Sequence, residues 1–167
     1  MATLTRAEAE DFLFYEARLL DEERLKDWLS LMTSDVVYWV PNNADEVDPS
    51  SHISIIYDNY LRLENRVWRI TESGLNHTQD PPSKFIRFIS NISTEPAERD
   101  DEATVRCNVL LTEYRPGVAR DAARDPSWRA ARCDYRLRSV DGTWKIAQRK
   151  VMLLDNDGPL PAMTYVF

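Results

Sequence analysis

The sequence is poor in the residues that small catalytic and nucleotide-binding motifs require. It holds only two histidines, two cysteines and four glycines in 167 residues. No HExxH zinc motif, no P-loop and no GxGxxG dinucleotide motif occurs. Loops that cradle phosphate groups depend on glycine for close backbone approach, so this scarcity excludes that class of nucleotide site.

The same scarcity argues against a metal centre in this chain. A Rieske cluster takes two cysteines and two histidines as ligands, and here Cys107 and Cys133 lie far apart with no histidine nearby. A two-histidine, one-carboxylate iron site needs convergent histidines, whereas His52 and His77 flank a predicted helix. Both cysteines fall in predicted strands, so we expect buried, reduced thiols without a disulfide. The sequence therefore predicts no cofactor-binding or metal-ligating residue in this chain.

Charge and hydropathy exclude further classes of protein. The net charge of −7 and the pI of about 4.9 disfavour nucleic acid and anionic membranes as partners. No apolar run reaches the roughly 18 residues of a membrane span, and no signal-peptide pattern opens the chain. We therefore expect a cytoplasmic protein. With 43% hydrophobic residues, it has enough apolar side chains for the core of one domain over residues 1–167.

Residues 12–41 predict two helices that lead into a strand. Thr5 and Glu8 form a capping-box pattern, and Asp21 is a candidate cap for the second helix. In both helices apolar residues recur at helical spacing; the members are Phe12, Tyr15, Leu19, Leu20, Leu25, Trp28, Leu29 and Met32. The β-branched and aromatic residues 36–40 then favour a strand, which the next proline ends.

The middle of the chain predicts one more helix and a long connection. Residues 52–57 fit a short edge strand or a helix start, and Asp58 is the expected cap of the helix that follows. Its inward positions are expected to be Leu61, Leu63, Val67 and Ile70. The connection 71–83 contains two consecutive prolines, and long loops in compact domains often lie at a functional rim or an interface.

Alternating polarity predicts antiparallel strands in the second half of the chain. Four strands are expected, over residues 84–94, 103–112, 128–140 and 143–154. Ile86 and Phe88 share one side of the first, and Asp141-Gly142 is a hairpin signal before the last. The polar excursion 115–127 interrupts the run. The tail ends on the apolar residues 165–167, which predicts that it docks against something rather than being disordered.

This order of elements predicts an α+β fold. A helix pair that feeds a strand needs a sheet to cover, and a mostly antiparallel sheet curls around such helices into a cone. That arrangement resembles the nuclear-transport-factor-2-like (NTF2-like) fold: a curved, mixed, mostly antiparallel sheet wrapped on N-terminal helices.

Cone folds of this kind can hold an acid–base pocket, and six side chains are candidates for one. They are Asp35, Tyr38, His52, Tyr57, Asp58 and His77. For each, a structural role such as a cap, a core aromatic or a surface residue explains the residue as well. The aromatic side chains, Trp28 and Tyr38 among them, are expected to pack the cone.

Arginines are numerous for an acidic protein, and several lie on strands opposite the expected core face. The set comprises Arg66, Arg69, Arg87, Arg132, Arg136, Arg138 and Arg149. A solvated sheet face explains them, and so does a docking face, because arginine is enriched at protein interfaces.

Three blocks of sequence carry a resemblance to a known family. They read FLFYEARLLDEERLKDWLSLMTSDVVYWVP, then ISIIYDNYLRLENRVWRI with DPPSKFIRFISNI, and finally WKIAQRKVMLLD. In this order, from Phe12 to Asp155, they resemble the small (beta) subunit of the Rieske-type aromatic-ring-hydroxylating dioxygenases. The stretches Ile53–Tyr57 and Leu63–Val67 look closest to the benzoate-type branch, which acts on aromatic carboxylates.

The resemblance implies a structural subunit of an enzyme complex, with no catalytic residue in this chain. Its partners are a large alpha oxygenase subunit and other beta subunits, usually as α3β3. The alpha subunit carries the Rieske [2Fe–2S] cluster and the mononuclear Fe(II), and the complex adds both atoms of O2 to an aromatic ring with electrons from NADH. Two departures put the contacts of one loop in doubt: Asn76–Gln79 replaces an aromatic-acidic stretch, and Lys84 stands where an arginine is common.

Two other functions fit the same fold. A stand-alone isomerase, dehydratase or hydrolase would use Asp35 or a histidine as a base, at the floor of a deep pocket with a titratable group. A ligand-binding or scaffolding module would have an apolar pocket without such groups. A solidly packed cone would exclude the enzyme.

Overall fold

The computed structural model describes residues 4–43, 48–49, 51–74, 76–116, 126–156, 158 and 165–167. The helices are α1 (Arg6–Asp21), α2 (Leu25–Leu29), α3 (Tyr60–Thr71) and the 3-10 turn η1 (His77–Gln79). The strands are β1 (Met32–Val40), β2 (Ile56–Asp58), β3 (Lys84–Pro96), β4 (Glu102–Tyr114), β5 (Ser127–Val140) and β6 (Thr143–Leu153). Most of the predicted excursion 115–127 lies outside the described residues.

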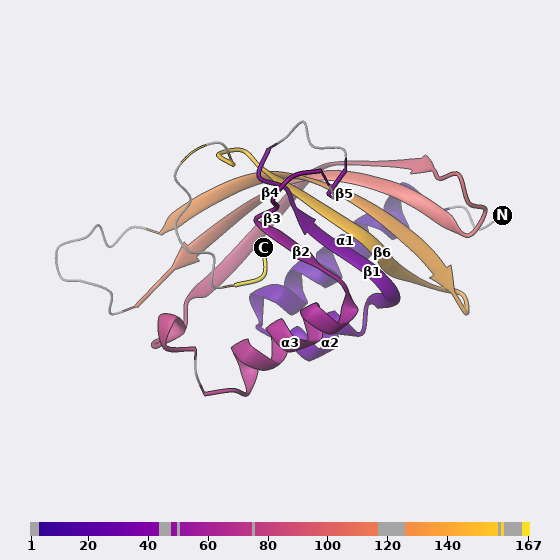
Figure 1. Ribbon diagram of the computed structural model, residues 1–167. Coiled ribbons are helices and arrows are strands. Elements are labelled where there is room, and N and C mark those ends of the chain that lie inside the picture. The colour runs from indigo at the N-terminus through magenta and orange to yellow at the C-terminus, as the bar shows by residue number, and fades with distance from the viewer. Residues whose placement is uncertain are drawn as a thin grey trace.

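The six strands form one curved sheet in the order β2-β1-β6-β5-β4-β3. β1 pairs with β6 in parallel, and every other pairing is antiparallel. The sheet arches over the helices (Figure 1), and the view along it shows α1 closing one side of the curve, with α2 and α3 below. The predicted α+β class, the mixed sheet and the cone are confirmed.

The start of the chain follows the sequence pattern with two corrections. Thr5 caps α1 in the predicted capping box, with the Glu8 carboxylate accepting from the Thr5 backbone. Asp21 does not cap α2: it ends α1, and its carboxylate accepts hydrogen bonds from Arg87 instead. The helix α2 is short, because β1 already begins at Met32, inside the stretch predicted as helix.

The third helix also differs from the prediction at its start. Asp58 ends the edge strand β2, and Asn59 caps α3 through its side chain. The register of α3 buries Leu63 and Val67 as expected but leaves Leu61 62% exposed. Of residues 52–57, the last two belong to the short edge strand β2, and none of them begins a helix.

The sheet has a core face and an outer face, and the expectation that the strand arginines lie opposite the core was wrong for two of them, whereas Ile86 and Phe88 do share one side of β3 as predicted. The inward alternation of β4 and β5 is confirmed, with Cys107 opposite Cys133 as free, buried thiols. In β3, however, Arg87 is buried while Ile86 and Phe88 are exposed. Arg149 also lies on the core face, so two of the arginines expected opposite the core are inside it. Each inward guanidinium has an acidic partner there, which permits its burial.

Candidate functional site

The interior of the cone holds a hydrogen-bonded network around one buried carboxylate, that of Glu16 on α1. Its Oε1 accepts from Trp28 Nε1 at 3.0 Å, and its Oε2 accepts from the Tyr135 hydroxyl at 2.8 Å. Arg149 Nε donates to the same hydroxyl at 2.9 Å and lies 3.5 Å from Glu16 Oε1. All four side chains are at most 2% exposed, so the network joins α1, α2, β5 and β6 inside the core.

Arg149 is the centre of this interior. Its guanidinium lies 5.6 Å from the ring centroid of Tyr38 and 5.5 Å from that of Tyr135, in the range of cation–π contacts. Burial by itself lowers the pKa of Arg149, but the nearby Glu16 carboxylate outweighs it, and the net pKa is raised well above the ordinary value. Arg149 therefore stays charged inside the cone.

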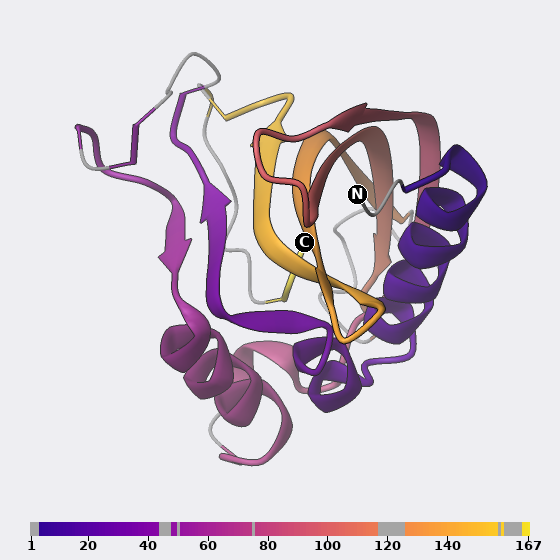
Figure 2. The same ribbon diagram turned by 90° about the vertical axis from the view of Figure 1, so that its right-hand side faces the viewer.

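The end of the chain fills the remaining space between sheet and helices. Figure 2 shows the C terminus within the curve of the sheet. Tyr165, Val166 and Phe167 are buried, and Arg149 Nη1 donates to the Phe167 carbonyl at 2.7 Å. Arg87 Nη2 donates to the Val166 carbonyl, which ties the same segment to β3. The predicted docking of the tail is confirmed.

The hollow that remains beside this segment is too small for a substrate. It has a volume of about 20 Å³ and is lined in part by Leu20, Phe85 and Tyr165. A pocket for a small organic molecule measures about 300–1,000 Å³. Larger hollows of about 430 and 600 Å³ are open grooves on the outside of the molecule, beside α1 and between α2 and α3.

The six acid–base candidates are not gathered into one pocket. Only Tyr38 and Asp58, which are paired across β1 and β2, are close in register. Asp58 is committed to Arg66, whose Nε and Nη2 both lie 2.7 Å from its Oδ2. The other four lie on the surface, where they form no shared site: Asp35, His52, Tyr57 and His77.

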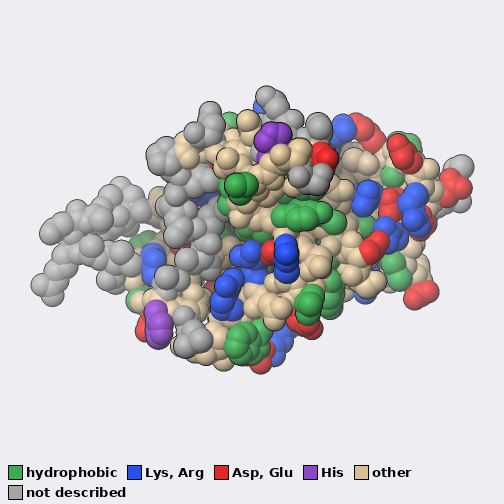
Figure 3. Space-filling model, in the orientation of Figure 1, with side chains coloured by type: hydrophobic (Ala, Val, Ile, Leu, Met, Phe, Trp, Pro, Cys, Tyr) green, Lys and Arg blue, Asp and Glu red, His purple; other side chains and the backbone are tan. Residues whose placement is uncertain are grey.

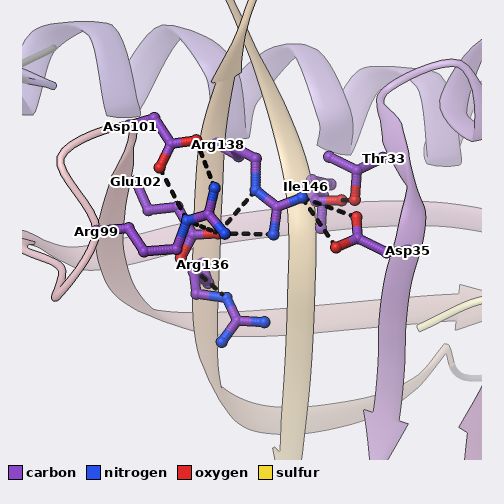
Figure 4. Close-up of polar contacts among 8 residues, drawn as sticks. All are labelled: Thr33, Asp35, Arg99, Asp101, Glu102, Arg136, Arg138 and Ile146. Carbon is purple, nitrogen blue, oxygen red and sulfur yellow. Dashed lines mark hydrogen bonds and ion pairs between the residues drawn. The ribbon is translucent and has the colours of Figure 1, made fainter.

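Asp35, the favoured base of the stand-alone enzyme hypothesis, is part of a surface ion-pair cluster (Figure 4). Both its oxygens lie 2.9 Å from Arg138 Nη1. The Thr33 hydroxyl, and after it the Arg138 guanidinium, lower the pKa of Asp35. A carboxylate with a lowered pKa is a weaker base, so its environment disfavours the role.

The centre of that cluster is Glu102, whose side chain is only 3% exposed. Arg138 Nε and Nη2 each lie 2.7 Å from its Oε1, Arg136 Nε lies 3.3 Å from its Oε2, and Arg99 Nε lies 3.7 Å away. Figure 3 shows cationic and anionic side chains interspersed toward the right-hand edge of the molecule. The cluster links β1, β4 and β5, and its acidic and basic side chains form ion pairs with one another. It is therefore a structural site.

The outer face of β3, β4 and β5 carries a set of exposed, large apolar side chains, which we call the outer apolar patch. Its members are Ile86, Phe88, Leu110, Tyr114, Trp128 and Leu154. Phe88 pairs directly with Leu110, and Thr112 lies between Ile86 and Trp128 in register. Leu154 follows β6 next to the same strands, since its N–H donates to the Ala130 carbonyl. A gathered apolar surface of this kind marks an interaction site.

The described part of the chain meets the requirements of neither a metal-binding cluster nor a membrane-spanning helix. Among those residues, no group of three or more His, Cys, Asp or Glu side chains is placed to hold a metal ion. No helix there is both long enough and apolar enough to span a bilayer.

Sequence reasoning missed the buried network around Glu16 and Arg149. Two signals pointed to it. Glu16 falls on the apolar face of its helix, and Arg149 lies two and four residues before Val151 and Leu153, on the same inward face of its strand. Neither signal identifies the partner residues, because the partners of Glu16 are distant in the sequence. Both Tyr135, 119 residues away, and Arg149 lie more than 100 positions from it.

The comparisons with known proteins agree with one another. The family described as "Ring hydroxylating beta subunit" matches residues 15–157. The small oxygenase component of the p-cumate 2,3-dioxygenase system of Pseudomonas putida is 32% identical over 154 residues, 91% of this chain and 81% of that protein. The beta subunit of benzoate 1,2-dioxygenase from Burkholderia mallei superposes with a TM-score of 0.76 at 28% identity, covering 99% of this chain and 100% of that one.

A fourth comparison concerns the fold alone. An NTF2-like protein from Novosphingobium aromaticivorans superposes with a TM-score of 0.60 at 15% identity, over 90% of this chain and 82% of that one. It agrees with the cone described above. Fold, sequence match and relatives together show that the chain belongs to the family of beta subunits of aromatic-ring-hydroxylating dioxygenases.

Proposed function

We propose that this chain is the structural, non-catalytic beta subunit of a cytoplasmic, multicomponent aromatic-ring-hydroxylating dioxygenase. In this proposal it supports an alpha subunit that carries a Rieske [2Fe–2S] cluster and a mononuclear Fe(II), as part of an α3β3 complex. The complex performs NADH- and O2-dependent cis-dihydroxylation of an aromatic compound. The whole chain acts as one domain whose task is to bind and hold other subunits.

The filled cone is the observation that carries this proposal. An enzyme with this fold would need an open interior that contains an unpaired acid or base. Here the interior carboxylate, Glu16, already accepts from Trp28 and Tyr135 and lies beside Arg149. The tail takes the remaining space. A core with this much internal bonding supports a scaffold better than an enzyme.

The outer apolar patch supports a docking role. Interface cores are rich in aromatic side chains, and Trp and Tyr dominate binding energy where they are fully covered. Trp128 is 69% exposed and Phe88 is 56% exposed on this chain. Such side chains are stabilised when a partner removes them from water, at about 25 cal/mol per Å² of apolar surface. We propose that the alpha subunit covers the patch.

We further propose an aromatic carboxylate as the substrate of the complex. Both p-cumate and benzoate, the substrates named for the two relatives above, are aromatic carboxylates. The sequence stretches that resemble the benzoate-type branch point the same way. Because the interior hollow among the described residues measures only about 20 Å³, we expect the alpha subunit to select the substrate.

Co-expression with a candidate alpha subunit tests the proposal. The tagged chain should co-purify with a larger Rieske-type protein, and iron analysis should find the metal only in preparations that contain that partner. The chain alone should turn over no aromatic substrate. Stoichiometric iron in the isolated chain, or a stable monomer that ignores every alpha subunit offered, would refute the proposal. Conversion of a substrate by the isolated chain would instead revive the stand-alone enzyme.

A further inference from the structure

The guanidinium of Arg87 is buried, and one of its nitrogens has no acceptor within the described part of the chain. The side chain is 2% exposed; its Nη1 donates to the Asp21 carboxylate and its Nη2 donates to the Val166 carbonyl. The third nitrogen, Nε, has no hydrogen-bond partner there. An arginine Nε always carries its hydrogen, so only an acceptor can satisfy it. Buried donors without a partner are rare in proteins, because each loses its bond to water on folding.

In three other arginines of this chain, the edge of the guanidinium formed by Nε and Nη2 meets a carboxylate. The pairs are Arg66 with Asp58, Arg99 with Asp101 and Arg138 with Glu102. In Arg87 the same edge meets only the Val166 carbonyl, which Nη2 binds. The N–H groups of this edge point in nearly the same direction, because the guanidinium is a rigid, planar fork. The acceptor for Arg87 Nε must therefore lie beside the Val166 carbonyl.

A hollow of about 20 Å³ lies where this acceptor is required, since both Arg87 and Val166 line it. A cavity needs about 10–15 Å³ to hold one water molecule, so the hollow has room for water but not for an organic ligand. Its lining is not purely apolar, because Glu23 and Gln79 belong to it as well. Apolar cavities stay dry, whereas a cavity with polar groups in its walls holds water that makes about three hydrogen bonds.

We infer that this hollow is a binding site for a single water molecule, whose oxygen accepts a hydrogen bond from Arg87 Nε. The two hydrogens of the water then donate to acceptors of the lining, where Glu23, Gln79 and the backbone carbonyls are available. The water and the Val166 carbonyl share one edge of Arg87, so the water is part of the contact between β3 and the end segment 165–167. This inference goes beyond the proposed scaffold function and does not depend on it.

The charges around the hollow favour water over an ion. The Asp21 carboxylate already pairs with Arg87, and Glu23 adds an acidic residue to the lining, so a bound anion would meet like charge. A cation would face the donor Nε of a guanidinium, which carries the same sign of charge. Water is uncharged, accepts from Nε and donates to the acidic and carbonyl oxygens around it.

Nuclear magnetic resonance of the full, isotope-labelled chain tests the inference. The Nε–H signal of Arg87, assigned through its own side-chain carbons, should show cross-relaxation with water of the sign that marks a water molecule tumbling with the protein. A rotating-frame experiment separates this signal from hydrogen exchange. The matched control within the same chain is Arg66, whose Nε donates to Asp58 at 2.7 Å and should show no such cross-relaxation.

Ile70→Phe enlarges a side chain in the lining, so the water signal at Arg87 should disappear in this variant. Ile55→Phe is the control, because Ile55 also packs partly buried against the core but does not line the hollow, and the signal should remain.

Three results would overturn the inference: no water signal at Arg87 Nε in the unmodified chain, an undiminished signal in folded Ile70→Phe, or a saturable shift of the Nε–H resonance on titration with sodium bromide. The last result would assign the hollow to an anion. If Ile70→Phe does not fold, the unmodified chain and the bromide titration still decide. None of these readouts involves the alpha subunit, so failure here leaves the scaffold proposal standing.

Discussion

Arg138 on β5 and Glu102 on β4 face each other across the sheet, and two guanidinium nitrogens of Arg138 each lie 2.7 Å from one oxygen of Glu102. The same guanidinium reaches Asp35 on β1 at 2.9 Å, as Figure 4 shows. One arginine therefore links three strands, although β1 and β5 are separated in the sheet by β6. Since Glu102 is almost fully buried, removing one partner of this link should cost more stability than breaking a surface ion pair does.

The first prediction concerns that buried carboxylate. Glu102→Gln keeps the shape of the side chain but leaves Arg136 without its buried anion and Arg138 with only the exposed Asp35, so the free energy of unfolding should fall by about 3 kcal/mol. Urea unfolding followed by circular dichroism measures it. The control is Glu95→Gln, which removes an exposed pair with Arg106 and should cost less than about 1 kcal/mol. Equal losses in the two variants would show that the burial of Glu102 adds nothing.

The second prediction concerns the pH dependence of stability through Asp35. Its pKa in the folded chain is below the ordinary value of 3.8, so folding is favoured when the group is ionised. This contribution is fully present above pH about 4 and is lost as the pH falls through the lower, folded pKa. Because the side chain is 59% exposed, solvent screening keeps the effect below about 1 kcal/mol.

Asp35→Asn isolates this contribution. The variant should be less stable than the parent at pH 7, and the difference should shrink as the pH is lowered from 4 toward 2 and the parent's carboxyl takes up its proton. Urea unfolding at pH 7 and at pH 2 measures the difference. A variant that stays equally destabilised at pH 2 would assign the loss to packing or to the amide rather than to the charge.

Local patterns predicted the elements of this fold well, and contacts between distant elements explain where they failed. The alternation in β4 and β5 holds because apolar residues such as Val105 and Tyr135 face one core. The rule that apolar residues face the core fails in β3. Arg87 points inward there because it donates hydrogen bonds to Asp21, at the end of α1, and to the Val166 carbonyl. The β3 sequence alone does not predict these partners, because they lie 66 and 79 residues away along the chain.

The functional residues divide in the same way. The composition shows that the sequence contains few histidines and cysteines that could bind a metal, and three sequence blocks predicted the family. Asp58 was predicted as a helix cap from its position, but the one-residue shift of the cap to Asn59 freed it to pair with Arg66. The network of Glu16, Tyr135 and Arg149 depends on the way the sheet curls over α1, which only tertiary structure determines.

The third prediction concerns the paired thiols. Cys107 and Cys133 lie opposite each other on β4 and β5, and both are buried. The hydrogen bond with Cys133, and burial after it, raise the pKa of the Cys107 thiol. Because the thiolate is the reactive form, the native chain should react with a thiol reagent at least about 1,000-fold more slowly than the unfolded chain.

Absorbance during reaction with Ellman's reagent measures these rates, with and without urea. Leu154→Cys places a thiol at a 72% exposed position and serves as the control, because it should react at once in the native chain. Fast reaction of two thiols in the native parent would mean that the β4–β5 pairing opens readily.

The last prediction concerns the outer apolar patch. Trp128→Asp puts a charge at the most exposed aromatic side chain of the patch, so a partner that covers the patch must desolvate that charge on binding. Association with the alpha subunit should weaken by at least about 30-fold, equivalent to about 2 kcal/mol, as expected of an aromatic side chain that a partner buries. Leu61→Asp on α3 is the matched control, since Leu61 is similarly exposed but lies away from the patch. Size-exclusion chromatography and co-purification with the alpha subunit report the result, with circular dichroism confirming that both variants fold. If Leu61→Asp disrupts the complex and Trp128→Asp does not, the alpha subunit docks on the helical side of the cone, and the outer face of β3–β5 must be covered by something else.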